Sequence, residues 1–232
     1  MTVAIIQFGG SNCDQDVLHV LQDVVGLDAR LVWYKEDNLS GFEGVVIPGG
    51  FSYGDYLRAG AIAARTPIME SVKELAAEGK PVLGICNGFQ VLTESGLLAG
   101  ALTTNMYPKF RCQPTCLRVE STGTPFTSRF KKGEVVRIPI AHKEGNFYAT
   151  EDTLAQLEHH DLVVFRYADA EGHVTDEVNP NGSQENIAGI VSTSRNVLGM
   201  MPHPERASED ILGSKDGLKI FESMADHITG SA

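Results

Sequence analysis

The stretch from Gly84 to Gly88 places Cys86 between two glycines, each two residues away. An apolar run ends just before Cys86 and helical residues follow it, so the spacing predicts a sharp strand-to-helix turn with the thiol at its apex. This is the cysteine counterpart of the Gly-x-Ser-x-Gly nucleophile elbow. At a helix N-terminus the dipole stabilises a thiolate, the form of cysteine that attacks carbonyl groups. The alternative is a buried structural cysteine, because free cysteine is among the most buried residue types.

A cysteine nucleophile works with a proton-transfer partner, most often histidine. Of the seven histidines, His203 stands out because prolines flank it within Met201–Arg206. Pro204 favours an extended backbone at His203, where residues two apart point the same way with Cα atoms about 6.5 Å apart. We therefore expect Glu205 to hydrogen-bond the His203 imidazole and to leave its other nitrogen facing Cys86. Alone, His-Pro-Glu favours an ordinary surface turn; its place downstream of the elbow makes the pair credible.

Short apolar runs alternate with amphipathic stretches along much of the chain, a pattern typical of a parallel sheet covered on both faces. From residue 111 to 140 the runs instead indicate strands joined by turns, and so an antiparallel extension of the sheet or a small subsidiary lobe. Strands are expected at residues 3–8, 29–34, 44–47, 81–85, 162–167, 187–191 and 197–201, and helices at 17–25, from Pro67 onward, around 150–160 and at 218–228.

The predicted fold class is therefore α/β, with a mostly parallel sheet, helices on both faces and an antiparallel extension in the middle of the chain. Gly26 is expected to end the first helix, and Pro67 stands where a helix start tolerates proline. The sequence contains no internal repeat and no linker-like change in composition. Residues 1–232 are thus expected to form one domain.

Composition excludes several classes of protein. The 232 residues carry 19 basic and 30 acidic side chains, a formal charge of −11, which argues against binding nucleic acid or anionic membranes. A hydrophobic content of 42% indicates a globular chain. Four cysteines are too few for a disulfide scaffold. No apolar run approaches the roughly 20 residues of a membrane span, and the N-terminal residues lack signal-peptide features, so the expected compartment is the reducing cytoplasm.

At Cys86 and the His203-x-Glu205 pair the sequence resembles the class I, triad-type glutamine amidotransferases. Further stretches carry the resemblance: GSNCD at 10–14, PGGFSYGDYLR at 48–58, CNGFQ at 86–90, AHKEGNFY at 141–148 and PHPER at 202–206. FSYGDYLR and HKEGNFY look like the branch that forms small glutaminase subunits in purine biosynthesis. The resemblance covers nearly the whole chain and implies the family's flavodoxin-like fold. Lys143 departs from it, since a glycine is expected after the histidine, and the loop at 176–184 is long.

The resemblance implies hydrolysis of glutamine to glutamate and ammonia through a γ-glutamyl thioester on the cysteine. Two backbone N–H groups, of Asn87 and of Gly50, are expected to form the oxyanion hole, and glycine at position 50 allows a close approach of the backbone to the substrate. By the same resemblance Gln90, His142 and Phe147 are expected to contact glutamine. For His142 a hydrogen-bonded structural role is an equal alternative.

The chain contains neither a G-x-x-x-x-G-K-[ST] phosphate loop nor G-x-G-x-x-G. ATP, Mg²⁺ and the ammonia acceptor are therefore expected on a separate large synthetase subunit, with a small third subunit in the complex, and this chain is expected to hold no cofactor or metal. Cys112 and Cys116 lack the second ligand pair of a zinc site, and Cys13 is expected to be structural or interfacial. Two alternatives stay open: a glutaminase that serves another acceptor, and a catalytically inactive interaction subunit of the same fold.

Overall fold

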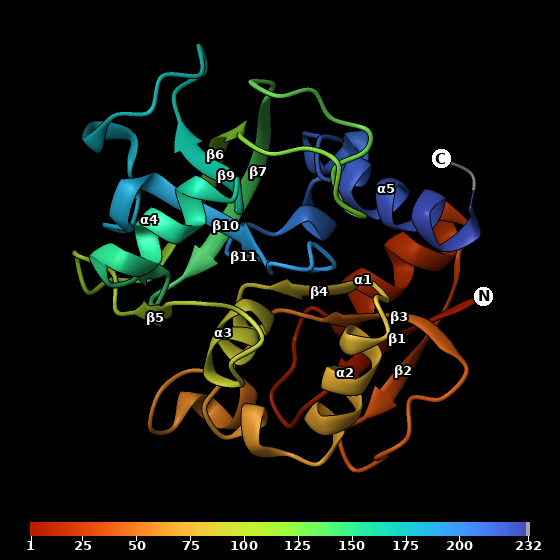
Figure 1. The fold of residues 1–232 in the computed structure, drawn as a ribbon. Helices are drawn as coiled ribbons and strands as arrows, with labels where there is room; N and C mark the ends of the chain where they lie inside the picture. The colour runs from red at the N-terminus through yellow and green to blue at the C-terminus, as the bar shows by residue number, and fades with distance from the viewer. Residues whose placement is uncertain (231–232) are drawn as a thin grey trace.

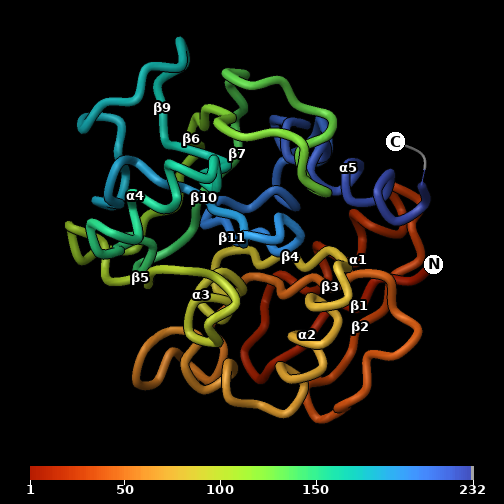
Figure 2. The backbone as a smooth tube through the Cα atoms, viewed as in Figure 1, coloured from red at the N-terminus to blue at the C-terminus, as the bar shows by residue number. Residues whose placement is uncertain are grey.

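A computed structural model describes residues 1–230, and a nine-stranded sheet runs through it (Figures 1 and 2). The order of strands in this sheet is β2-β1-β3-β4-β11-β10-β9-β6-β7, and β5 pairs with β8 in a separate ribbon. The strands are β1 (Thr2–Gln7), β2 (Asp28–Trp33), β3 (Phe42–Ile47), β4 (Val82–Ile85), β5 (Ala101–Thr103), β6 (Arg111–Val119), β7 (Val135–His142), β8 (Asn146–Tyr148), β9 (Val163–Ala168), β10 (Ile187–Val191) and β11 (Val197–Met200).

The sheet changes character at β11. From β2 to β11 every neighbouring pair is parallel, whereas β10, β9, β6 and β7 each run antiparallel to their neighbours. All four residues of β4 are buried, as expected for a central strand covered on both faces. The carboxyl ends of the parallel strands β3, β4 and β11 meet at one edge, where ligands of such sheets commonly bind.

Helices cover both faces of the parallel half. In Figure 1, α1 and α5 lie on one side of β1, β3 and β4, and α2 and α3 lie on the other. The helices are α1 (Asp14–His19), α2 (Ile68–Ala77), α3 (Asn87–Glu94), α4 (Glu151–His159) and α5 (Leu218–Thr229), with a π-helical turn η1 (Val20–Val25) and short 3-10 turns η2 (Ser52–Asp55), η3 (Ala63–Arg65), η4 (Asp176–Val178), η5 (Gln184–Asn186), η6 (Pro204–Arg206) and η7 (Asp210–Leu212). None of the described helices is long and apolar enough to cross a membrane.

The predicted α/β class and antiparallel extension are confirmed. The middle strands join the main sheet through the pairing of β6 with β9 and do not form a separate lobe. The first predicted helix is in fact α1 continued by η1, and Gly26 ends it with φ of +78°. The ribbon of β5 and β8 was not expected, because three-residue strands are too short to show a period. The predicted domain boundary at 232 lies outside the described residues.

The turn from β4 to α3 depends on two glycines. A β-carbon at Gly84 would lie 2.8 Å from the backbone of Gly88, and one at Gly88 would lie 2.0 Å from Ile47 O on β3. The helix therefore packs on the sheet at a separation that no side chain at either position permits. This close approach brings the first turn of α3 to the carboxyl ends of β3 and β4.

Gly88→Ala tests that constraint. Alanine favours a helix over glycine by about 1 kcal/mol, so propensity alone predicts a more stable protein. We expect the opposite, a loss of about 1–3 kcal/mol in the free energy of unfolding, because the methyl group meets the Ile47 carbonyl. Urea denaturation measures this loss. Gly9→Ala is the control, since nothing lies within 4 Å of a β-carbon there, and similar effects of the two substitutions would contradict the packing argument.

Candidate active site

Cys86 lies at the apex of the turn between β4 and α3, where the glycine spacing predicts it. Its backbone has φ of +50° and ψ of −103°, a strained conformation for a residue with a side chain. The N–H of Cys86 donates to Met200 O on β11 at 2.8 Å and holds the turn against the sheet. Cys86 is 5% exposed, and its thiol donates to Ala141 O at 3.7 Å. Strain at a turn of this kind is typical of an elbow that presents a nucleophile.

His203 follows β11 and has the extended backbone that Pro204 favours. Its Nδ1 lies 2.6 Å from Oε1 of Glu205, and both side chains are buried. The expectation that Glu205 continues the extended segment is wrong, because Glu205 lies in η6, whose tight turn carries the carboxylate back onto the imidazole. His203 Nε2 has no hydrogen-bond partner among the described residues. This nitrogen is therefore the one available for proton transfer.

Buried charges set the protonation of His203. Burial by itself lowers the pKa of the imidazole, but the carboxylate of Glu205, and then the thiolate of Cys86, raise it, so that the pKa lies well above its ordinary value of 6.5. His203 is thus suited to carry a proton that it can donate to a leaving group.

Asn87 and Gly50, whose N–H groups the sequence predicts as oxyanion donors, lie just beyond the ends of β4 and β3. Asn87 is the first residue of α3, so its N–H has no acceptor within the helix. Gly50 follows β3 with φ of +154°, and a β-carbon there would lie 2.7 Å from Gly10 O and 2.8 Å from Asn12 N. Only glycine fits this backbone. The oxyanion role of both N–H groups stays a prediction.

A cavity of about 360 Å³ opens beside Cys86. Its lining consists of Gly50, Phe51, Gly54, Asp55, Cys86, Gln90, Phe110 and residues 141–144. The volume lies in the range of small-molecule sites. A substrate in this cavity would therefore face the thiol, the Gly50 backbone and several polar side chains together.

The chain matches the model of the CobB/CobQ-like glutamine amidotransferase domain over residues 1–225. It belongs to this family. It is similar to the phosphoribosylformylglycinamidine synthase subunit PurQ of Methanosarcina acetivorans, with 76% identity over 229 residues and 99% of each chain covered. The solved structure of PurLQS from Thermotoga maritima matches with a TM-score of 0.86 at 45% identity, over 98% of both chains. A glutamine amidotransferase from Thermotoga maritima, with a TM-score of 0.60 at 16% identity over 98% of this chain and 97% of that one, shares the fold.

Two of the predicted substrate contacts in this glutamine amidotransferase occupy different places. Gln90 lines the cavity, and its amide also links two walls: Oε1 accepts from Asn87 Nδ2 at 2.9 Å, and Nε2 donates to Glu144 O at 2.6 Å. Phe147 is absent from the described lining of the Cys86 cavity. It is fully buried and stacks on Phe89 of α3, with ring centroids 6.1 Å apart. Phe147 therefore packs in the apolar core and supports α3, the helix that follows Cys86.

His142 ends β7, is buried and lines the cavity. Asn181 Nδ2 donates to His142 Nε2 at 3.0 Å, and this orientation of the amide is fixed because Asn181 Oδ1 accepts from Ser183 N–H at 3.0 Å. The proton of the neutral ring is therefore assigned to Nδ1, which has no partner within the described chain. Burial, and then the positive charge of His203, lower the pKa of His142 to about 3. Its place in the cavity lining is consistent with a substrate contact, and its hydrogen bond to Asn181 is consistent with a structural role.

Cys13, expected to be structural or interfacial because it lacks an evident base partner, lies against His203. Its Sγ is 3.9 Å from His203 Nδ1 and accepts from Arg206 Nη2 at 3.1 Å. Gly49 makes room for this contact, since a β-carbon there would lie 2.7 Å from His203 Cε1 and 3.1 Å from Cys13 Sγ. Cys13, His203 and Glu205 offer three ligand atoms within 4.8 Å of one another, although the His203–Glu205 hydrogen bond already occupies two of them. The one feature of the sequence that pointed to this place for Cys13 is its position in the GSNCD stretch, which is part of the family resemblance.

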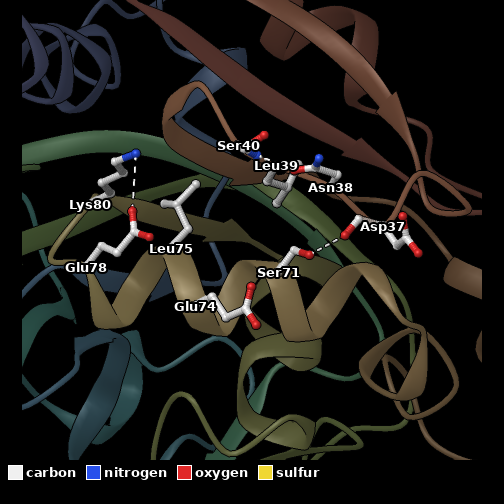
Figure 3. A pocket seen from close by; sticks show the side chains of 9 residues that line it. All are labelled: Asp37, Asn38, Leu39, Ser40, Ser71, Glu74, Leu75, Glu78 and Lys80. Carbon is white, nitrogen blue, oxygen red and sulfur yellow. Dashed lines mark hydrogen bonds and ion pairs between the residues drawn. The ribbon is translucent and has the colours of Figure 1, made fainter.

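A second cavity, of about 430 Å³, lies between residues 37–40 and α2 (Figure 3). Two pairs of its polar groups interact: Lys80 Nζ pairs with Glu78 at 3.3 Å, and the Ser71 hydroxyl donates to a carbonyl of the 37–40 segment. Among the described residues that line it there is neither cysteine nor histidine. Cys86 and His142 instead line the 360 Å³ cavity, and His203 lines an adjoining cavity of about 160 Å³ that also includes Cys86.

The depressed pKa of His142 predicts a pH-dependent contribution to stability. The unfolded chain binds a proton at this histidine below about pH 6.5, while the folded chain stays neutral down to about 3. The contribution is therefore complete above pH 6.5 and is lost as the pH falls, with a slope of about 1.4 kcal/mol per pH unit. Urea denaturation between pH 7 and 5 should show this extra loss in the wild type and not in His142→Gln. Parallel curves for the two proteins would contradict it.

Proposed function

We propose that this chain is the glutaminase subunit of phosphoribosylformylglycinamidine synthase, and that it supplies ammonia from glutamine to a synthetase subunit. Relatives named phosphoribosylformylglycinamidine synthase subunit PurQ are 52–76% identical to this chain over almost its entire length. The observation that carries the chemistry is the buried Glu205–His203 hydrogen bond at 2.6 Å beside a strained cysteine. These are the parts of a nucleophile, a proton-transfer group and a group that orients it.

In the first step the Cys86 thiolate attacks the carbon of the glutamine side-chain amide. The carbonyl oxygen becomes an oxyanion, which the N–H groups of Asn87 and Gly50 stabilise, each donor contributing about 3–4 kcal/mol. The C–N bond then breaks as the departing nitrogen takes a proton from the His203 imidazolium. Ammonia leaves, and a γ-glutamyl thioester stays on Cys86. Glu205 holds the imidazole orientation and stabilises its charged form.

In the second step a water molecule attacks the thioester carbon. His203, now neutral, takes one proton from this water as the new C–O bond forms, and the same backbone donors stabilise the second oxyanion. The C–S bond breaks, glutamate leaves, and the thiolate and imidazolium are restored. Atoms balance as glutamine plus water giving glutamate plus ammonia.

The ammonia passes to a large synthetase subunit, where ATP and Mg²⁺ are proposed to bind and where formylglycinamidine ribonucleotide is made, in a complex that includes a small third subunit. A negative charge of −11 on this chain suits a basic surface on a partner. The cytoplasm is the proposed compartment, in keeping with four cysteines that are all unpaired.

Cys86→Ala tests the nucleophile. We expect glutamate release by the complex with its synthetase partners to fall at least about 10³-fold, because no other group attacks the amide carbon. Cys112→Ala is the matched control, since Cys112 is exposed on β6 and its loss should leave the rate unchanged. Glutamate release that persists in Cys86→Ala would have another source than this thiol. That outcome, or no glutamate release by the wild-type complex, would favour the catalytically inactive interaction subunit.

Glu205→Gln tests the orienting carboxylate. The amide keeps the shape but removes the charge that raises the pKa of His203, so we expect kcat to fall by about 10²- to 10⁴-fold and the pKa of His203 measured by NMR to drop. Glu209→Gln is the control, because it disrupts an exposed Glu–His pair, Oε2 to His19 Nε2 at 2.9 Å, away from the thiol. Equal rates for the two variants would remove Glu205 from the mechanism.

A further inference from the structure

Glutamine has two ends, and the mechanism accounts for one of them. The side-chain amide meets Cys86, His203 and the oxyanion donors, while the α-ammonium and α-carboxylate groups must face the outer part of the cavity. This inference rests on the proposed function, because it assumes that glutamine is the substrate. The question is which residue of the cavity makes the site select glutamine over other amides.

We propose that the Asp55 carboxylate binds the α-ammonium group of glutamine and so determines the specificity of this cavity. Asp55 lines the same cavity as Cys86 and Gln90. It belongs to the FSYGDYLR stretch, which the proposed mechanism otherwise uses only through the nearby Gly50 backbone.

The first support is an unsatisfied acceptor. Asp55 Oδ1 is buried and has no hydrogen-bond partner among the residues that the structure describes. A buried carboxylate oxygen without a donor is costly, and hydrogen bonds to charged groups are stronger than neutral ones. The Asp55 carboxylate lines the cavity and makes no hydrogen bond to the described residues, so an ammonium group in the cavity supplies the donors and the opposite charge that the carboxylate lacks.

The second support is the backbone that holds Asp55 in place. Its φ is +53°, and Tyr53 and Leu57 on either side also have positive φ, a run of strained residues that persists only when its surroundings impose it. The segment is tied to the nucleophile turn, because Ser52 N–H donates to Asn87 Oδ1 at 3.1 Å. Asp55 is thus held at a fixed position relative to Cys86. A fixed separation between the two groups selects substrates of one length.

The third support is the charge around Asp55. Burial, and then the negative charge of Glu144 across the cavity, raise the pKa of Asp55 to about 6. The other titratable groups that line the cavity are His142, which is neutral, the exposed Lys143 and the Cys86 thiol. An acidic pair favours a cationic ligand group, and Lys143 is the nearby cation that suits the α-carboxylate. Recognition by Asp55 is expected to weaken as the pH falls through 6, because protonation removes its charge.

The test compares glutamine with glutaramate, which is glutamine without the α-amino group, as substrates of the complex assembled with its synthetase partners. Asp55→Asn suits this test because asparagine tolerates a positive φ, so the backbone is preserved. We expect kcat/KM for glutamine to fall about 10- to 100-fold in Asp55→Asn, mostly through KM, and kcat/KM for glutaramate to stay the same. The rise of KM for glutamine below pH 6 should also disappear.

Glu144→Gln and Asp37→Asn are the comparison variants. Glu144 is the other carboxylate of the cavity, and Asp37 lies in the separate cavity of Figure 3. A loss of preference for glutamine in Glu144→Gln but not in Asp55→Asn would overturn the inference. So would an equal loss of both substrates in Asp55→Asn, which would indicate a role in folding or in partner contact. A wild-type complex that hydrolyses neither substrate would instead overturn the proposed function, and this inference with it.

Discussion

The active site depends on how closely α3 packs against the ends of β3 and β4. With hydrogen as the only side chain at Gly84 and Gly88, the helix starts where the strands end. The turn must then pass through a left-handed conformation at Cys86, which is held by a hydrogen bond to β11. The thiol, the free N–H of Asn87 and the carboxyl end of the strand that precedes His203 are brought together by this one packing constraint.

The second half of the sheet supplies the other wall of the site. β7 carries Ala141 and His142, although three strands separate it from β11 in the sheet order. The gap is bridged by His203 N–H, which donates to Pro139 O on β7 at 2.8 Å. His203 therefore joins the parallel half of the sheet, which leads to Cys86, to the antiparallel half, which carries one wall of the cavity.

Most of the fold could be predicted from the sequence, because long strands and helices leave a period. Cys86, His203 and Glu205 could be predicted for a different reason: glycine and proline at fixed offsets restrict the backbone around them. What escaped prediction depends on contacts between distant segments. The amide of Asn181 orients His142 from a loop that looked merely long, and Cys13 contacts His203 across 190 residues. Phe147 has the same apolar character in a pocket as in a core, so only packing decides its place.

The left-handed backbone at Cys86 sets stability against activity. A residue with a side chain in such a conformation costs about 1–3 kcal/mol, and glycine would adopt it with little strain. Replacing Cys86 with glycine would thus relieve this strain but would also remove the thiol. Stability therefore favours glycine at this residue, whereas activity requires cysteine. A gain in stability must come from other positions in the fold.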